Sequence, residues 1–284
     1  MRVVSLLAST TEILFAIGAG ADVVGVTFEC DFPAEARERR IVSSTSMPEG
    51  LTPAEIDDVV TAAVAAGEDL YRLDAGALAD LDADLVVTQD LCAVCAIDVS
   101  LVDDALTHLG CRAEVLTFDP HTLEQVLASV TTIGAAVDRV AEAEALVLSL
   151  RARLDAVRRH VAARSGRGDR PRVVLLEWTD PPYAPGHWIP EMIETAGGAC
   201  VLGTAGDKSV RVTWEQVREA RPDVVLVAPC GYDRAGARTQ ADALVAAGLL
   251  PEDVRIHALD ADAMWARPGP RLVDGVEELA SLLG

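Results

Sequence analysis

Two cysteines spaced three positions apart are the first candidates for chemistry in this sequence. Cys92 and Cys95 lie in "TQDLCAVCA", directly after the apolar run "DLVVTQ". A C-x-x-C turn brings two sulfurs to one point, where they can bind a metal ion or cluster, or form a redox couple. Asp98 and Asp103 follow the pair and oppose the thiolate that a redox motif needs. The pair therefore favours a metal site over a thiol-redox site.

Two further cysteines also follow apolar runs. Cys30 comes after "DVVGVTFE" and Cys230 after "DVVLVAP". Ligands of open parallel sheets bind beyond the carboxyl ends of the strands, so we expect all four thiols to face one cleft if two sheets face each other. Four thiolates suit an iron–sulfur cluster first and Zn next. The alternative is that Cys30 and Cys230 are packing residues and the C-x-x-C is an incidental loop.

The remaining cysteines and the aromatic residues have less specific signals. Cys111 and Cys200 are expected to be small buried hydrophobic residues. A group of aromatic residues falls in loops that should border the cleft, where they could form a wall for a flat or apolar ligand, although packing between lobes explains them about equally well: Trp178, Tyr183, Trp188 and Trp265. For Trp214 we favour a role in packing.

Other side chains are candidates for contact with a ligand. His187 could join a metal site, and Arg267 and Arg271 could hold an anionic group. The sequence has no nucleophile elbow, Walker loop, G-x-G-x-x-G or H-E-x-x-H motif. We therefore expect a binding protein and no enzyme activity.

The elements that must position these residues follow an α/β pattern. Short β-branched runs alternate with longer amphipathic stretches on both sides of a middle segment, residues 122–164, and this is typical of parallel sheets covered by helices. From Asp138 onward the middle segment lacks Gly and Pro, which predicts one long helix. We predict two Rossmann-like lobes, residues 1–120 and 169–284, joined by a single long backbone helix within 121–168, with the ligand cleft between the lobes.

Local signals mark two helices. Ser9-Thr10-Thr11-Glu12 is a capping box that predicts a helix start, and this helix should end at the glycines near residue 18. A second helix is predicted between Pro190 and Gly197.

Composition excludes some partners. The chain has 24 basic and 45 acidic residues, a net charge of −21, which argues against nucleic acid and anionic membranes. No apolar stretch reaches the roughly 18 residues of a membrane span. "MRVVSLLAST" is too short for a secretory signal, so we expect a cytoplasmic protein with reduced thiols.

Several stretches together resemble the cobalamin-binding-type proteins of the class III substrate-binding (helical-backbone metal receptor) superfamily. These are "RVVSLLASTTEILFAIGAGADVVGVTFECDFP", "DLVVTQDLCAVCA", "EWTDPPYAPGHWIPEMIETAGG", "APCGYD" and "RPGPRLVD". The resemblance covers essentially the whole chain. It implies two lobes on a rigid helix and a cleft that binds a cobalamin, haem, siderophore or metal.

The resemblance also implies site residues. Matching positions are Glu29, Cys30, Asp31, Gln89 to Cys95 including Asp90, Trp178, Trp188, Cys230 and Arg267 to Arg271. Phe28 stands where this branch usually has His, and His187 where it usually has Asn, so a metal or polar contact could have moved between lobes. Glu215 matches one of two docking glutamates of importer proteins, but Gly76 occupies the place of the other, which puts docking to a permease in doubt.

Three functional hypotheses remain open. The first is a non-enzymatic binding protein whose four cysteines, Cys30, Cys92, Cys95 and Cys230, ligate a metal centre. The second is a carrier of cobalamin or another metal chelate, with cysteines that do not ligate. The least supported is a C-x-x-C thiol-redox protein.

Overall fold

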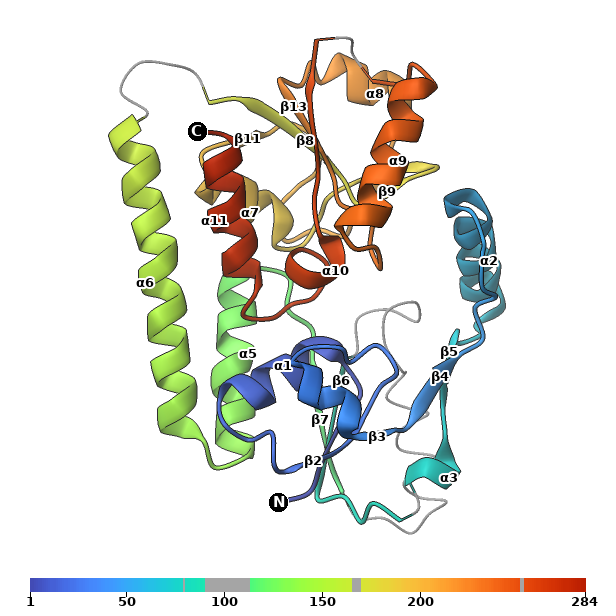
Figure 1. The fold of residues 1–284 in the computed structure, drawn as a ribbon, viewed down its shortest axis with the longest axis vertical. Helices are drawn as coiled ribbons and strands as arrows, with labels where there is room; N and C mark the ends of the chain where they lie inside the picture. The colour runs from blue at the N-terminus through green and yellow to red at the C-terminus, as the bar shows by residue number, and fades with distance from the viewer. Residues whose placement is uncertain (79, 90–112, 165–169, 251–252) are drawn as a thin grey trace. The chain divides into compact units, whose positions relative to one another are not determined.

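The computed structural model describes residues 1–78, 80–89, 113–164, 170–250 and 253–284 (Figure 1). The chain divides into two compact units. The N-terminal unit consists of Met1–Asp119 and Leu127–Val147, and the C-terminal unit of Pro120–Val126 and Leu148–Gly284. Each unit contains its own parallel sheet with helices, which confirms the predicted α/β class.

The N-terminal unit is built on a five-stranded parallel sheet with the order β3-β2-β1-β6-β7. Its strands are β1 (Val3–Ser5), β2 (Val23–Val26), β3 (Arg40–Ile41), β6 (Leu85–Gln89) and β7 (Glu114–Phe118). A separate antiparallel pair consists of β4 (Ser43–Thr45) and β5 (Tyr71–Leu73). The central strand β1 is completely buried, as expected for an apolar run covered on both faces.

The first helices of this unit are α1 (Ala8–Ala16), the 3-10 helix η1 (Ala34–Glu38), α2 (Pro53–Ala66) and α3 (Ala75–Leu78). The predicted capping box at Ser9 is wrong, because α1 has Leu7 as its N-cap and no side-chain cap. The hydroxyls form a buried network instead: the Ser5 Oγ lies 2.6 Å from Thr10 Oγ1 and accepts a hydrogen bond of 2.8 Å from Thr11 Oγ1. Ser and Thr hydroxyls can form hydrogen bonds with backbone groups or with one another, so a sequence motif alone does not identify the residue that caps the helix.

The middle segment contains two helices, α5 (Leu123–Ala136) and α6 (Val140–Arg164). Helix α6 covers the stretch without Gly or Pro for which a long helix is predicted. The two helices approach closely where α5 has Gly134, because a Cβ added there would lie 2.3 Å from the Ala143 Cβ. Both helices are divided between the two units, α6 after Val147.

The C-terminal unit has a four-stranded parallel sheet with the order β11-β8-β13-β14. These strands are β8 (Arg172–Leu176), β11 (Ala199–Cys200), β13 (Val224–Val227) and β14 (Arg255–Ala258). A three-stranded antiparallel sheet is formed by β9 (Trp178–Thr179), β10 (Pro182–Ala184) and β12 (Val210–Arg211). The helices are α7 (Ile189–Thr195), α8 (Trp214–Glu219), α9 (Arg234–Ala246), α10 (Ala261–Met264) and α11 (Leu272–Leu282).

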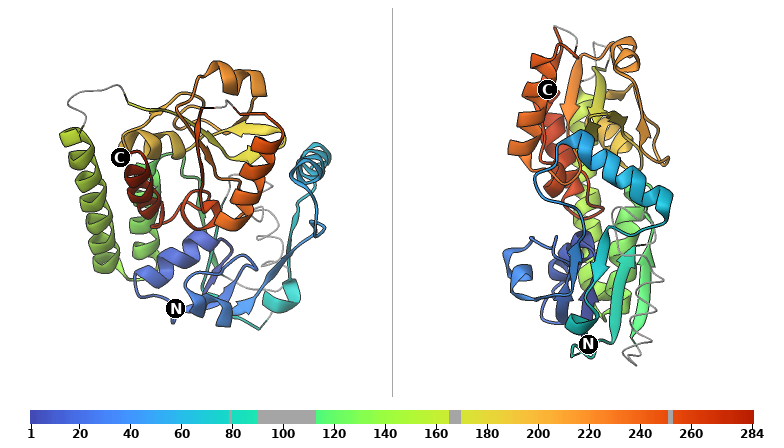
Figure 2. Two further views of the ribbon diagram at one scale, coloured as in Figure 1. Left: turned by 45° about the horizontal axis from the view of Figure 1, so that its top comes forward. Right: turned by 90° about the vertical axis from the view of Figure 1, so that its right-hand side faces the viewer.

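Helices cover both faces of this parallel sheet (Figure 2). Val174 packs in one apolar cluster with residues of α9, whereas the neighbouring Val173 lies near Ile193 of α7 and Leu283 after α11. Successive side chains of a strand point to opposite faces, so the two valines sit on different faces of the sheet. The predicted helix between Pro190 and Gly197 is α7.

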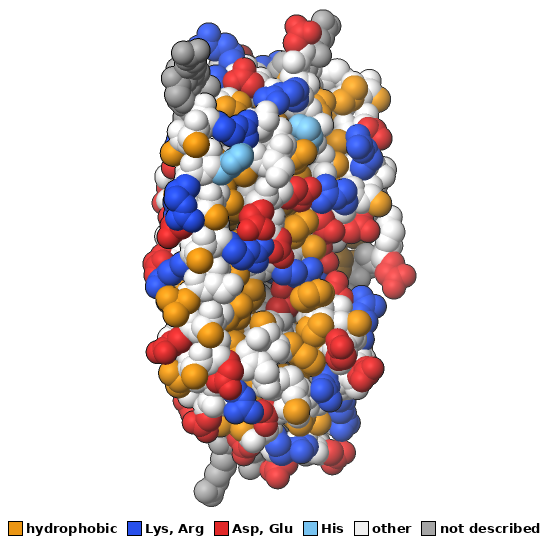
Figure 3. Space-filling view, turned by 60° about the vertical axis from the view of Figure 1, so that its left-hand side comes forward, with side chains coloured by type: hydrophobic (Ala, Val, Ile, Leu, Met, Phe, Trp, Pro, Cys, Tyr) orange, Lys and Arg blue, Asp and Glu red, His pale blue; other side chains and the backbone are white. Residues whose placement is uncertain are grey.

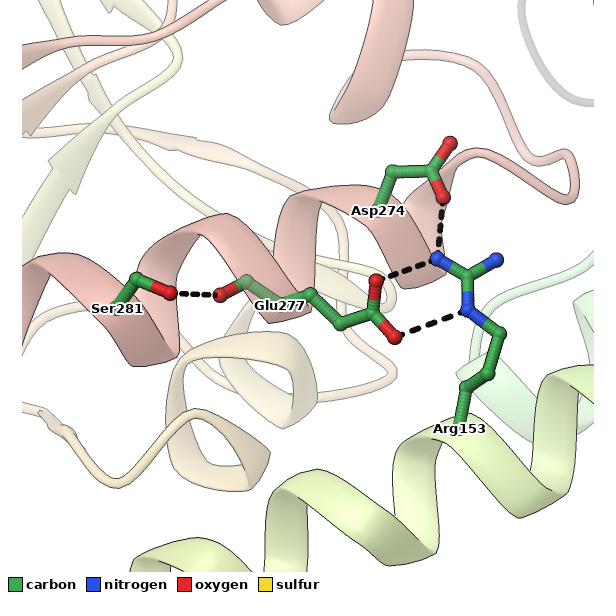
Figure 4. Close-up of polar contacts among 4 residues, drawn as sticks. All are labelled: Arg153, Asp274, Glu277 and Ser281. Carbon is green, nitrogen blue, oxygen red and sulfur yellow. Dashed lines mark hydrogen bonds and ion pairs between the residues drawn. The ribbon is translucent and has the colours of Figure 1, made fainter.

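One arginine connects α6 with α11 inside the C-terminal unit (Figure 4). Arg153 donates through Nε to Glu277 Oε1 at 2.9 Å, and its Nη2 pairs with both Asp274 and Glu277. Hydrogen bonding to Arg153 lowers the pKa of Glu277. The interaction holds the C-terminal half of α6 to the last helix of the chain.

The surface carries charges of both signs. On the face shown in Figure 3, basic and acidic side chains are interspersed with hydrophobic ones. None of the helices in the described ranges is long and apolar enough to cross a membrane.

Candidate ligand-binding site

The carboxyl end of β2 leads into a loop with several candidate residues. Phe28 is exposed and its ring centroid lies 5.6 Å from that of Tyr71, which begins β5. The Tyr71 hydroxyl donates a hydrogen bond of 2.6 Å to Glu29 Oε1. Phe28, Glu29 and Tyr71 thus form one cluster of two aromatic rings and a carboxylate, with Asp31 half-buried nearby in the chain.

Tyr71 is absent from the residues that sequence patterns indicate. It lies 42 positions from Glu29, and β5 is only three residues long, so no periodicity marks it. The one available signal is its rarity, since the chain has three tyrosines.

The four candidate metal-binding cysteines receive no support as a group. Cys30 is only 3% exposed and its sulfur lies 3.0 Å from Thr11 Oγ1, which itself belongs to the buried hydroxyl network. Cys230 is exposed after β13 and donates its backbone N–H to the Glu177 carbonyl. Cys92, Cys95, Asp90 and Cys111 lie outside the described residues, and of Gln89 the structure describes only its place at the end of β6. Over the described part of the chain, no group of three or more His, Cys, Asp or Glu side chains could hold a metal ion.

A second aromatic pair follows the strands of the C-terminal unit. Trp178 begins β9 directly after β8, and its ring centroid lies 5.9 Å from that of Tyr232, which follows β13. The Trp178 indole N–H donates to the Asp180 carbonyl at 3.1 Å. Tyr183 on β10 lies below the Arg211 guanidinium, 5.7 Å from ring centroid to Cζ. Trp178 and Tyr232 therefore lie together beyond the carboxyl ends of β8 and β13.

Two of the predicted wall residues are buried inside the C-terminal unit instead. Trp188 is 6% exposed and Trp265 0% exposed, and the Trp188 indole N–H donates to the Trp265 carbonyl at 2.9 Å. In this structure neither ring has a face open to a ligand. Trp214 is half-buried as the first residue of α8.

Arg267 and His187 have local contacts, and Arg271 directly precedes the last helix. Arg267 forms an ion pair with Asp262 at 2.8 Å, and Arg271 is the N-cap residue of α11. His187 has a left-handed backbone with φ 49°, and its ring contacts those of Trp188 and His121, at centroid distances of 5.6 and 5.3 Å.

Glu177 is a half-buried acid at the carboxyl end of β8 that the sequence patterns do not indicate. Its carboxylate accepts hydrogen bonds from the Ser209 hydroxyl and the Gly186 N–H. Burial raises the pKa of Glu177 to about 7, an effect that these hydrogen bonds partly offset. The sequence signal that could have indicated Glu177 is its position directly after the apolar run "RVVLL".

Comparisons with known proteins match nearly the whole chain. A family model described as periplasmic binding protein matches residues 3–247. An uncharacterized ABC transporter substrate-binding lipoprotein of Bacillus subtilis (strain 168), YvrC, is 25% identical over 287 residues, covering 98% of this chain and 78% of that protein.

Two solved structures share the fold. The periplasmic heme-binding protein BhuT, in complex with two hemes, is 25% identical with a TM-score of 0.73, covering 100% of this chain and 99% of that one. The periplasmic vitamin B12 binding protein BtuF of Vibrio cholerae is 21% identical with a TM-score of 0.64, covering 99% and 96%. The family match and the shared fold confirm the resemblance to substrate-binding proteins that the sequence motifs indicate.

These matches correct the predicted location. The expectation of a cytoplasmic protein is wrong, because the matched family is periplasmic and the Bacillus subtilis relative is a lipoprotein, which together point outside the cytoplasm. The composition of a folded domain does not record on which side of a membrane it works. Because the cytoplasmic location is wrong, the argument that a reducing compartment keeps the cysteines as thiols no longer applies.

The expectation of a binding protein without enzyme activity is confirmed, because the matched proteins are substrate-binding proteins. With its family model matched over residues 3–247, the chain belongs to the periplasmic binding protein family and is a substrate-binding protein rather than an enzyme.

Proposed function

We propose that this chain is the substrate-binding component of an ABC importer for a tetrapyrrole, either haem or a corrinoid. The observation that carries the proposal is the aromatic pair at the carboxyl end of each parallel sheet, Phe28 with Tyr71 and Trp178 with Tyr232. Flat aromatic side chains suit the faces of a large conjugated macrocycle.

The comparisons support the same ligand class. BhuT is described with two bound hemes and BtuF as a vitamin B12 binding protein, and both match this chain over nearly its full length. The importer role rests on the Bacillus subtilis relative, a substrate-binding lipoprotein of an ABC transporter. Glu215, exposed in the first turn of α8, is the candidate contact with a permease.

Tyr71 distinguishes haem from a corrinoid. Haem iron takes an axial ligand from its protein, and a tyrosine phenolate is one of the known ligands. Glu29 Oε1 accepts a hydrogen bond of 2.6 Å from the Tyr71 hydroxyl and so holds the phenol oxygen in place. A corrinoid carries its own axial ligands and depends less on such a group.

The experiment adds haemin and cyanocobalamin separately to the purified full chain and records calorimetry, visible absorption and tryptophan fluorescence. We expect one of them to bind at micromolar or tighter affinity and to quench Trp178. If haem is the ligand, Tyr71→Phe should change its absorption spectrum and weaken its binding. Tyr183→Phe should change neither, because it keeps the aromatic ring of this candidate wall residue and removes only a hydroxyl that is not proposed as an iron ligand. If a corrinoid is the ligand, both variants should bind it as the parent does.

Absence of heat and of spectral change with both compounds would contradict the proposal. The four-cysteine metal centre has no support in the described residues, and the same preparation tests it. Stoichiometric iron with sulfide, or zinc, that disappears in a Cys92→Ser/Cys95→Ser variant would revive it.

A further inference from the structure

Glu177 lies between β8 and β9, and its main chain joins two neighbouring segments of the C-terminal unit. Its N–H donates to the Tyr183 carbonyl at 3.1 Å, and its own carbonyl accepts from the Cys230 N–H at 3.1 Å. Tyr183 belongs to β10, and Cys230 lies two residues before Tyr232 in the segment after β13. The backbone of Glu177 therefore connects the segment of Tyr183 with the segment of Tyr232.

The side chain of Glu177 adds a third segment to this connection. Oε1 accepts from the Gly186 N–H at 3.3 Å, and Oε2 accepts from the Ser209 hydroxyl. Gly186 follows β10 in the chain, and Ser209 directly precedes β12. One carboxylate therefore holds the loop after β10 and the loop before β12.

The two loops that share the carboxylate are in tight contact with each other. A Cβ at Gly186 would lie 2.4 Å from the Asp207 carbonyl oxygen and 2.5 Å from the Ser209 backbone nitrogen, so this approach requires glycine. The His187 N–H donates to the Asp207 carbonyl at 2.6 Å. The loops are therefore packed as one body, to which Glu177 is attached.

Aromatic side chains of the candidate site belong to the segments that this carboxylate joins. Trp178 is the next residue and pairs with Tyr183 in the antiparallel register of β9 and β10. Its ring centroid lies 5.9 Å from that of Tyr232. The residue after it, Thr179, is buried and donates to the side-chain oxygen of a glutamine of α9. Trp178 is thus placed between two neighbours whose side chains are both anchored.

Hydrogen bonds rather than an ion pair hold Glu177. Burial is the largest cause of its raised pKa, the hydrogen bonds from Ser209 and Gly186 oppose it, and no charge of a described residue is among the causes. The charged residues on the adjoining segments are all exposed: Asp180, Asp207, Lys208, Arg211 and Asp233. A neutral side chain with the same shape and hydrogen-bonding capacity should therefore replace Glu177.

We propose that Glu177 is a positioning residue of the ligand site, which sets the aromatic faces of Trp178 and Tyr232 for contact with the ligand. The inference rests on the proposed function, because it requires a tetrapyrrole to lie against this aromatic pair. Glu177 acts through its neighbours, since both carboxylate oxygens are engaged by protein loops. Without the carboxylate the loops are released, and the ligand must then order the aromatic rings at the expense of its affinity.

The test measures the affinity of the purified full chain for haemin and for cyanocobalamin, by calorimetry and by quenching of tryptophan fluorescence. Glu177→Ala removes both side-chain contacts. It should weaken binding of the compound that the parent binds by roughly tenfold or more, and shift the tryptophan emission of the free protein. Ser209→Ala removes one contact and should have a smaller effect in the same direction.

Glu177→Gln is the conservative variant that should restore binding. Its amide oxygen accepts from the Gly186 N–H while its NH2 group donates to the Ser209 hydroxyl oxygen. We expect its affinity and its tryptophan emission to match those of the parent. Arg153→Met, which loses the contact of α6 with α11 in the same unit, controls for lost stability and should bind as the parent does.

The outcomes separate this inference from the proposed function. Parent affinity in Glu177→Ala, or a Glu177→Gln variant that binds as weakly as Glu177→Ala, would overturn the positioning role and leave the proposed function standing. Circular dichroism reports whether each variant folds. If Glu177→Ala does not fold, parent affinity in Ser209→Ala would overturn the role instead. A parent that binds neither compound would overturn the proposed function, and this inference with it.

Discussion

Glu177 is a single residue whose burial has a measurable consequence. The pKa of its carboxyl is raised from 4.5 to about 7, first by burial. The folded protein therefore holds this proton more tightly than the unfolded chain does. Its ionisation costs stability, so the contribution of Glu177 to the free energy of unfolding falls as pH rises from about 4.5 to 7.

We expect Glu177→Gln to remove this pH dependence. At pH 8 the variant should be more stable than the parent by about 1 to 3 kcal/mol, since one pKa unit corresponds to about 1.4 kcal/mol. The amide oxygen can accept from the Gly186 N–H while the amide NH2 donates to the Ser209 hydroxyl oxygen, so both contacts are kept. At pH 5 the two should be nearly equal. Urea unfolding at both pH values measures the difference, with Glu194→Gln on the exposed side of α7 as control. An unchanged pH slope in Glu177→Gln would show that its carboxyl is ionised without cost.

Between elements, the Arg153 interaction joins α6 to α11 (Figure 4). We expect Arg153→Met to lower the free energy of unfolding by about 1 kcal/mol, because the three side chains remain partly exposed and water screens the pairs. Arg158→Met removes an exposed pair with Asp155 within α6 and should have almost no effect. Equal losses in chemical denaturation would mean that the contact with α11 contributes no more than a surface pair.

Close packing of α5 on α6 gives a second prediction for elements. Gly134→Ala should destabilise the protein by about 1 to 3 kcal/mol, because the new methyl group would overlap Ala143 and approach the Arg139 carbonyl. Gly76→Ala in α3 is the control, since the added Cβ would approach only Asp74 Oδ1, at 3.3 Å. Thermal unfolding compares the two. A destabilisation of similar size at both sites would argue against a specific contact between the helices.

For the whole molecule, the net charge of −21 sets the response to salt. Like charges repel in the folded state, and screening reduces this repulsion. Tm should rise by a few degrees between low-salt buffer and physiological ionic strength. Sodium chloride and choline chloride should act alike, because the effect requires no specific ion. A Tm that falls with salt would show that attraction between opposite charges, which are interspersed on the face in Figure 3, outweighs the repulsion.

Much of the fold could be predicted because its signals are local. The run "RVVLL" is β8 and "DVVLVAP" contains β13, and both are buried throughout the strand apart from Arg172. Absence of Gly and Pro predicts α6, since each would interrupt a helix. Glu29 and Trp178 follow the strands β2 and β8, as their positions after apolar runs predict; their contact with a ligand stays a prediction.

The candidate site depended on contacts that no local pattern contains. Tyr71 reaches Glu29 across 42 positions, and His121 meets His187 only because Gly206 lies between their loops. Trp188 and Trp265, for which a ligand wall and packing were equally good explanations, are both buried, and the Trp188 indole N–H reaches the Trp265 carbonyl across 77 positions. The sequence by itself determined the class of fold and the places where the strands end, because periodicity and propensity act over a few residues. Only the tertiary structure decided which side chains are buried and which are neighbours, because burial and contact depend on segments that are far apart in the chain.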